Sequence, residues 1–340
     1  MQEDSVSCAQ GVRAAQDSPG PYVTSPRISV IICAYTEKRW DQTLAAVESV
    51  RRQSRESLEI ILVVDHNRVL RDRFASALPD VILLENTQAQ GLSGARNTGI
   101  ATARGDVIAF LDDDAIAEPD WLKFLADGYE DPAVAGVGGM TRPQWETKRP
   151  PWFPEEFDWV VGCTYRGMPR SRTPVRNILG GNASYRHEIF SLVGGFCTTM
   201  GRSSGKRPMG CEETELCIRI RQRRPDMVVL FENRAMISHW VPAARCRLSY
   251  FTARCYAEGL SKAVVAASVG AQDALSSERR HASRTLPTGI ARGLAAAING
   301  DLWGIARAGA IIIGLAAATA GYGVGSLPRR APRDVAVQSA

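Results

Sequence analysis

Three consecutive aspartates, Asp112 to Asp114, follow the short apolar run Val107–Leu111. Neighbouring carboxylates repel one another unless a cation or strong hydrogen-bond donors lie among them. On an extended backbone Asp112 and Asp114 would share one face. Such a pair can bridge Mg²⁺ or Mn²⁺ to a diphosphate, because hard cations prefer oxygen ligands. A helix N-cap, the other role open to an acidic residue before Glu118, needs a single aspartate. The pattern therefore predicts a metal site at the end of this run.

A second acidic pair, Glu212 and Glu213, opens the predicted helix Glu212–Arg223. Acidic residues in a first helical turn are ordinary partners of the helix dipole, which would account for either residue alone. The pair also follows a glycine-rich stretch, Gly201 to Gly210. In that position one carboxylate can act as a general base on a hydroxyl group while the other has a structural role.

The elements that must position these residues alternate along the first third of the chain. Short apolar, β-branched runs are typical of strands whose two faces are both covered, and helix-like stretches lie between them. This alternation predicts a doubly wound α/β sheet, in which ligands bind at the carboxyl ends of the strands. The predicted strands are Ile28–Ala34, Leu58–Val64, Val81–Leu84 and Val107–Leu111, and the predicted helices are Asp41–Arg52, Val69–Leu78 and Leu92–Ala103.

Polar residues follow the first two strands directly. Tyr35, Thr36 and Glu37 end the first strand, and Asp65 ends the second. A carboxylate in such a position can accept a hydrogen bond from a base or from a ribose hydroxyl, although a polar turn residue would look the same. The loop Gly91–Gly99 is no phosphate-binding P-loop by its spacing. Its glycines and helix start can still present backbone N–H groups to an anion, and Arg96 adds charge; a helix cap would explain the glycines alone.

The middle of the chain combines further elements with a long irregular excursion. That excursion, Arg142 to Pro174, is rich in Pro, Trp and Arg, which indicates a binding loop or lid. Its aromatic residues, Trp145, Trp152, Phe153 and Trp159, would either stack on the rings of a ligand or anchor the loop. The other elements predicted here are a helix at Pro119–Tyr129, a strand at Val134–Met140, and two closing strands at Val228–Phe231 and Met236–His239.

The last part of the chain is predicted to be helical. Residues 308–325 carry no charge, but many are Ala and Gly, which drive membrane insertion only weakly. We therefore expect membrane contact by a helix lying at the surface rather than a full span. The predicted helices are Leu248–Ala267, Pro287–Ile298 and Ile305–Ala320.

The composition of the chain limits the functions and the cellular compartment that we expect for it. The chain has 340 residues, of which 45% are hydrophobic, and a net charge of +5, which is too mild and diffuse to indicate nucleic-acid binding. Its eight cysteines lie singly, as expected of free thiols in a reducing compartment. The polar N-terminus cannot serve as a secretory signal. We expect a cytoplasmic protein with disordered ends at 1–26 and 326–340, a catalytic domain at 27–245 and a helical region at 246–325.

Several motifs in order resemble those of inverting glycosyltransferase family 2, which has the GT-A fold. The resemblance covers about Arg27 to His239. Ile28–Glu37 is similar to the family's opening strand, Gly94–Gly99 to its G-x-x-x-A-R-N-x-G loop and Phe110–Asp114 to its D-x-D motif. Gly180-Gly181-Asn182 with Gly194-Gly195-Phe196 resembles its acceptor-side segments, and Glu212–Arg219 its E-D-x-D-L-x-x-R pattern.

The resemblance implies a role for individual residues. Tyr35, Glu37 and Asp65 would contact the donor nucleoside, and Arg96 and Asp112 its ribose or diphosphate. The metal, Mg²⁺ or Mn²⁺, would be bound by Asp114 and by His239, although a lone histidine is equally often structural. Glu213 stands where the family has a catalytic aspartate. The residues expected on the acceptor side are Gly181, Asn182, Glu212 and Trp152.

These residues predict one activity and leave two alternatives. The expected enzyme transfers a sugar, with inversion, from a nucleotide sugar (UDP by family frequency) to a hydroxyl of a glycan or lipid-linked acceptor. We expect it to act in cell-envelope polysaccharide biosynthesis at the inner face of the plasma membrane. A sugar-nucleotide pyrophosphorylase would need a basic glycine-rich loop after its first strand, which the sequence lacks. A catalytically silent scaffold would not need Asp112, Asp114 and Glu213.

Overall fold

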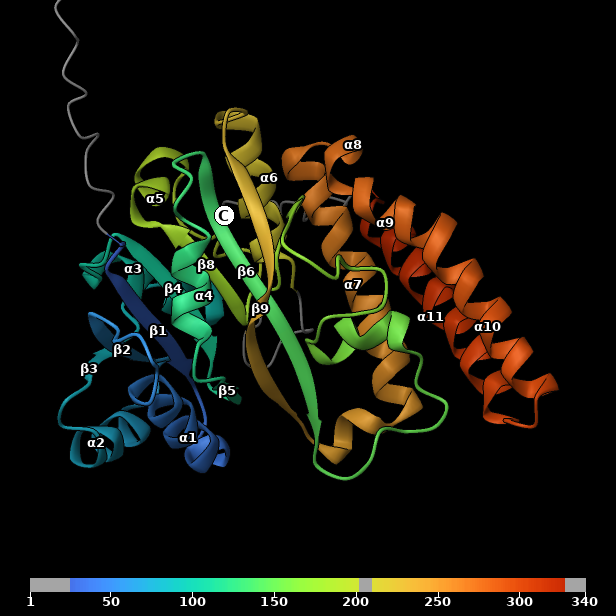
Figure 1. Cartoon of the computed structure of the whole chain (residues 1–340), viewed down its shortest axis with the longest axis horizontal. Helices are drawn as coiled ribbons and strands as arrows, with labels where there is room; N and C mark the ends of the chain where they lie inside the picture. Colours follow the sequence, from blue (N-terminus) through green and yellow to red (C-terminus); the bar gives the residue numbers. More distant parts are fainter. Residues whose placement is uncertain (1–24, 202–209, 328–340) are drawn as a thin grey trace, which may run out of the picture.

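The computed structural model describes residues 25–201 and 210–327. The disordered ends predicted at 1–26 and 326–340 therefore lie almost wholly outside the described residues. Most of the glycine-rich stretch before Glu212 lies outside them as well. The described residues form a sheet domain, at the left of Figure 1, and a layer of helices beside it.

A single nine-stranded sheet organises the first two thirds of the chain. Its order along the main path is β3-β2-β1-β4-β8-β6-β9-β5, and β7 pairs with β9. The first four strands are parallel, as their continuous apolar sequences predict. The strands are β1 (Ile28–Ala34), β2 (Glu59–Val64), β3 (Ile82–Glu85), β4 (Val107–Asp112), β5 (Ala115–Ala117), β6 (Val134–Trp145), β7 (Thr173–Val175), β8 (Asn182–Arg186) and β9 (Val228–Val241).

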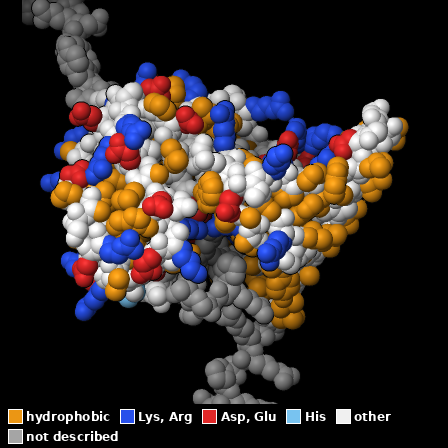
Figure 2. All heavy atoms as spheres, turned by 90° about the horizontal axis from the view of Figure 1, so that it is seen from below, with side chains coloured by type: hydrophobic (Ala, Val, Ile, Leu, Met, Phe, Trp, Pro, Cys, Tyr) orange, Lys and Arg blue, Asp and Glu red, His pale blue; other side chains and the backbone are white. Residues whose placement is uncertain are grey.

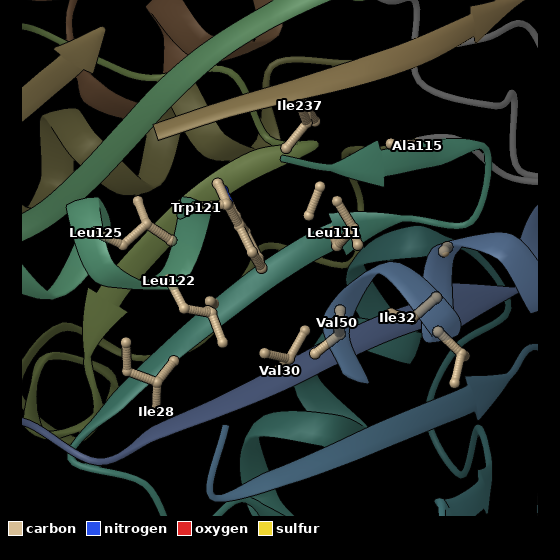
Figure 3. Close-up of a cluster of buried hydrophobic side chains, with 14 of the residues drawn as sticks. Ile28, Val30, Ile32, Val50, Leu111, Ala115, Trp121, Leu122, Leu125 and Ile237 are labelled. Carbon is tan, nitrogen blue, oxygen red and sulfur yellow. The ribbon is translucent and has the colours of Figure 1, made fainter. Parts of the chain in front are cut away.

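Helices cover both faces of this sheet. One face packs on α1 (Trp40–Arg51), α2 (Arg68–Ala77) and α4 (Trp121–Asp127), around the buried cluster drawn in Figure 3. The other face packs on α3 (Leu92–Thr102), α5 (His187–Val193) and α6 (Glu212–Arg223). Burial of two apolar layers against one sheet stabilises the doubly wound arrangement and fixes the strand ends that carry the polar residues.

The second half of the sheet is mixed rather than parallel. Strand β8 runs antiparallel to both β4 and β6, and β9 runs parallel to β6. Two closing strands were predicted at Val228–Phe231 and Met236–His239, but β9 is one strand of 14 residues. The two predicted pieces are its ends, because the pairing with β6 slips where Gly139 pairs with Glu232 and Met140 with Met236.

The C-terminal helices form a separate layer against the excursion after β6. Phe153, Phe157 and Phe251 are buried together at this contact, with Trp145 and Trp152 packed against them. The excursion is thus anchored by its aromatic residues. The excursion contains the turn η2 (Glu155–Val161). The C-terminal layer comprises η3 (Ala243–Cys246), α7 (Leu248–Val269), α8 (Ala271–Ala274), α9 (Ser276–Arg280), the π-helical turn η4 (His281–Thr285), α10 (Leu286–Ile298) and α11 (Trp303–Gly325). In the sheet domain, the short turn η1 (Glu37–Arg39) precedes α1.

Helix α11 is the described helix that is long and apolar enough to cross a membrane, and about 28% of its most apolar window is buried within the protein. It packs along α7, and α10 packs along α11 (Figure 1). Gly259 and Gly321 allow the close contact of α7 with α11, since a Cβ on either would lie 2.0 Å from a carbonyl oxygen of the other helix. The helix is therefore partly covered on one side and open on the other.

Candidate active site

A cavity of about 330 Å³ opens at the carboxyl ends of β1, β2 and β4. The topology brings to it the start of α3, the loop before β8, the start of α6 and residues of the C-terminal layer. Eight of the predicted site residues line it: Tyr35, Asp65, Arg96, Asp112, Asp114, Gly181, Glu212 and Glu213. The carboxyl ends of the parallel strands thus define the site, as such sheets require.

Asp112, Asp114 and His239 form a cluster with the chemistry of a metal site. One side-chain ligand atom from each lies within 4.8 Å of the others, and His239 Nε2 is 3.1 Å from Asp114 Oδ1. The antiparallel pairing of β5 with β9, which sets Ala115 opposite His239, brings the histidine to the aspartates. Two carboxylates and an imidazole suit Mn²⁺ and also allow Mg²⁺. A Cβ on Gly181 would lie 2.3 Å from Asp112 Oδ2, so the backbone leaves room for this carboxylate only because residue 181 is glycine.

Two arginines that the sequence did not single out neutralise the aspartates. Arg39 contacts Asp113 at 2.5 Å and Asp114 at 2.9 Å, and Arg245 lies 3.9 Å from Asp114. Burial alone would raise the pKa of Asp114, but His239 and the two arginines hold that pKa below its usual range. Burial raises the pKa of Asp113, and Arg39 opposes this only in part. Asp114 is therefore held in its ionised form, whereas burial favours the protonated form of Asp113, which lines the same cavity.

Arg96 links the donor side of the cavity to the acidic pair on α6. Its guanidinium is buried, contacts Glu212 at 3.1 Å and Asp112 at 3.5 Å, and donates to the carbonyl of Gly180 at 2.9 Å. A buried arginine with two carboxylate partners is held in one position. Arg96 therefore fixes the position of Asp112 relative to Glu212.

The residues after β1 and β2 differ in their access to the cavity. Asp65 is held by hydrogen bonds from Asn86 Nδ2 at 2.7 Å and from the backbone of Gly91 at 2.9 Å, and it faces the cavity. Tyr35 is half-exposed at the rim. Glu37 accepts a hydrogen bond from Asn67 at 2.9 Å but does not line the cavity.

Glu213 stands at the start of α6 behind a strained residue. Cys211, the N-cap, adopts φ +73°, a left-handed conformation rarely taken by residues other than glycine, and such strain gathers at functional sites. Burial raises the pKa of Glu213 to about 7, and the charge of neighbouring Glu212 adds to the effect. A carboxylate with this pKa takes up and releases protons near neutral pH, as a general base must.

Two of the residues predicted on the acceptor side do not reach the cavity. Asn182 is fully buried in the sheet, where it accepts from Trp121 Nε1 at 2.8 Å and donates to the carbonyls of Met140 and Ala235 at 3.0 Å. Trp152 packs on Phe153 and Phe251. A different tryptophan of the excursion, Trp159, lines the cavity. The side chains of Asn182 and Trp152 therefore make their contacts within the fold and not with the cavity.

The arrangement has counterparts among known proteins. Residues 29–194 match the family model described as glycosyl transferase family 2. The chain is 37% identical over 243 residues to a glucosyl-dolichyl phosphate glucuronosyltransferase from Haloferax volcanii, with 70% of this chain and 77% of that protein covered. It is 25% identical over 239 residues to the succinoglycan biosynthesis protein ExoM from Rhizobium meliloti, with 68% and 72% covered.

A solved structure shares the fold. A mannosyltransferase from Pyrobaculum calidifontis, in complex with GDP-Man and Mn²⁺, superposes with a TM-score of 0.54 at 18% identity, covering 86% of this chain and 87% of that one. The parallel half of the sheet and the aspartates at the end of β4 are thus set in a GT-A fold, as the resemblance implied. The chain belongs to glycosyltransferase family 2 and is a glycosyltransferase.

Proposed function

We propose that the enzyme transfers a sugar, with inversion, from a nucleoside diphosphate sugar to a hydroxyl group, and that it requires Mn²⁺ or Mg²⁺. The observation that carries this is the cavity itself, which is lined by Glu213 and by Asp112 and Asp114, the two aspartates that cluster with His239. In this arrangement the metal cluster would bind the diphosphate of the donor, and Glu213, a separate residue, would accept the proton of the acceptor.

The residues of this chain divide the reaction between them. Asp65 and Tyr35 would contact the nucleoside, and Asp112, Asp114 and His239 would hold the metal, which supplies positive charge to the diphosphate oxygens. Glu213 takes the proton of the acceptor hydroxyl as its oxygen bonds to the anomeric carbon. The bond from that carbon to the diphosphate oxygen breaks, and the nucleoside diphosphate leaves with the electron pair. Arg245 Nη1 is buried and has no hydrogen-bond partner among the described residues, so it is placed to donate to the leaving diphosphate.

The donor and metal assignments are tested together by calorimetry and activity. With Mn²⁺ present, the protein should bind one nucleoside diphosphate among UDP, GDP and dTDP and release it from the matching nucleotide sugar. Asp114→Ala removes a charged metal ligand and should weaken metal-dependent nucleotide binding at least tenfold. Asp127→Ala, on the far end of α4, is the matched control and should bind as the parent does. If Asp114→Ala bound nucleotide and Mn²⁺ as tightly as the parent, the metal assignment would be wrong.

The acceptor class and the place of action follow from different observations. The glucuronosyltransferase relative acts, by its name, on a lipid-linked substrate. In this chain α10, α11 and the turn between them expose apolar side chains, among them Ile298, Leu302 and Ile305. Figure 2 shows hydrophobic side chains gathered along this projecting part of the molecule. These features support a glycan or glycolipid acceptor of cell-envelope biosynthesis and an enzyme that works at the cytoplasmic face of the membrane.

A catalytically silent scaffold was the main alternative at the sequence level. Asp112, Asp114 and Glu213 line one cavity, and Arg96 and Glu212 hold their relative positions. A chain that only bound a partner would gain nothing from burying a carboxylate whose pKa is raised to about 7, because burial of an ionisable group costs stability. The geometry therefore favours catalysis.

A further inference from the structure

A second cavity, of about 370 Å³, lies next to the first, between the sheet domain and the C-terminal helices. The two cavities share Glu213 and Arg254 as lining residues, and Trp159 also faces both. The base proposed above thus stands where the two spaces meet. A molecule in the second cavity could present a group to Glu213 without displacing a donor from the first.

One part of the wall of the second cavity is apolar. It consists of Phe157 from the excursion, Leu286 from α10 and Leu315, Ala318 and Tyr322 from α11. Leu315 is 40% exposed, so the cavity reaches the surface along α11, the helix whose outer side carries exposed apolar residues. Hydrocarbon is the chemistry that such a wall accommodates.

Another part of the wall, which includes Glu213, carries charged side chains of both signs. Arg176 pairs with Glu278 at 2.5 Å, and Lys262 contacts Glu278 at 2.8 Å and Glu258 at 3.6 Å. Arg254 pairs with Glu258 at 3.1 Å. These three cations share two carboxylates, so Glu258 and Glu278 each contact two of them.

Arg254 is the cation with free donors. Its side chain is 9% exposed, and neither Nε nor Nη1 has a hydrogen-bond partner among the described residues. A buried guanidinium donor without an acceptor costs free energy, so its retention at a cavity needs a reason. An anionic group with two or more oxygens, placed beside Arg254, would accept from both atoms in the geometry that guanidinium prefers.

We infer that the second cavity binds the acceptor, and that the acceptor is an amphiphile whose anionic group, such as a phosphate, lies between its reacting hydroxyl and its hydrocarbon chain. The hydroxyl lies at Glu213, the anionic group at Arg254 and the hydrocarbon along α11. The inference rests on the proposed function, because it takes Glu213 as the base. It adds the chemical class of the acceptor and the part of the chain that binds it.

Binding of small probes to the full-length protein tests this without a donor. Isothermal titration should show that octyl phosphate binds at least tenfold more tightly than octanol or inorganic phosphate, because it alone offers both chemistries. Arg254→Gln should weaken octyl phosphate binding at least tenfold, and Arg254→Lys should restore part of it. Binding of octanol as tight as that of octyl phosphate would overturn the anionic assignment, and tight binding of inorganic phosphate alone would overturn the apolar one.

A second pair of variants tests the same cavity without changing the buried Arg254. Thr319 is exposed at the rim of the cavity, so Thr319→Trp narrows the entrance with little effect on folding and should weaken octyl phosphate binding at least tenfold. Ala320→Trp, one residue along the same helix and outside the lining, should leave the affinity unchanged. Equal binding to both variants would place the probe elsewhere and overturn the inference. If the parent bound octyl phosphate but no nucleoside diphosphate with Mn²⁺, the proposed function would fail while the cavity assignment stood.

Discussion

At the scale of single residues, Glu213 and Asp114 have opposite protonation behaviour although both are largely buried. Asp114 is surrounded by His239, Arg39 and Arg245, which hold its pKa low. Glu213 faces the like charge of Glu212, and burial raises its pKa to about 7. One carboxylate is thus kept ionised and the other can exchange a proton at neutral pH. This difference is what a reaction with a metal-bound leaving group and a separate base requires.

Substitution of Glu213 tests its role as a base. Glu213→Gln should lower kcat for transfer by a factor of roughly 10²–10⁴, the usual contribution of a general base, while Mn²⁺-dependent nucleotide binding stays within about twofold. Glu213→Asp keeps the carboxylate and should retain more activity than Glu213→Gln. The measurement is nucleoside diphosphate release with acceptor present. Equal rates for Glu213→Gln and the parent would remove Glu213 from the mechanism.

The pH profile is a separate test of the same residue. Burial disfavours the charged form of Glu213, so the base is protonated and inactive below about pH 7, and kcat should fall about tenfold for each pH unit below that value. Asp113 also has a pKa raised to about 7, so protonation of either residue would produce this fall in kcat at low pH, the acid limb of the profile. Glu212→Gln removes a like charge beside Glu213 and should move the limb to lower pH. A limb that stayed in place would point to Asp113 instead.

At the scale of elements, the short strand β8 explains why the side chain of Asn182, predicted on the acceptor side, lies in the sheet and not in the cavity. Its sequence, Asn182 to Arg186, carries no clear strand pattern, so the sequence predicts no strand here. The antiparallel pairing of β8 with β4 sets Asn182 opposite Leu111 and turns its side chain to the slip between β6 and β9. Gly181, one residue earlier, lines the cavity beside Asp112.

The stability of the protein should depend on this asparagine. Asn182→Ala leaves the buried N–H of Trp121 and two carbonyls without partners, which should lower the free energy of unfolding by roughly 2–4 kcal/mol. Asn299→Ala, at the exposed end of α10, is the control and should change it by about 0.5 kcal/mol or less. Urea denaturation followed by circular dichroism measures both. An Asn182→Ala protein as stable as the parent, but defective in acceptor use, would support the predicted acceptor-side role of Asn182.

Some site residues are predicted by the sequence and others are not. The two groups differ in whether the neighbouring sequence marks their position. Asp65 and Asp112 follow apolar strands directly, so the sequence alone predicts their shared edge of the sheet. Arg39, Arg245 and Arg254 come from separate helical segments, and nothing in their spacing distinguishes them from surface arginines. Only the packing of the C-terminal layer against the sheet brings the last two to the cavity. Contacts of this kind depend on tertiary structure, which periodicity does not encode.

At the scale of the whole molecule, the C-terminal layer joins the cavities to the exposed apolar side of α10 and α11. The second cavity opens along α11, and the exposed arginines Arg279, Arg280 and Arg284 lie just before α10. Cations beside an apolar helical face are the usual means by which a protein lies on an anionic membrane. Bound in this way, the enzyme would meet an amphiphilic acceptor at the mouth of the cavity that holds it.

Membrane contact is tested by co-sedimentation with vesicles of phosphatidylcholine and phosphatidylglycerol. Ile298 and Leu302 are 87% and 73% exposed at the α10–α11 turn, so Ile298→Asp with Leu302→Asp should leave the fold intact and reduce the bound fraction at least fivefold, because charged groups oppose entry into the interface. Val69 is 67% exposed but lies on α2, so Val69→Asp should bind vesicles as the parent does. Higher salt should weaken binding of the parent if the arginines contribute. A double variant that sedimented like the parent would mean that another face meets the membrane, since these side chains form the most exposed part of the apolar row.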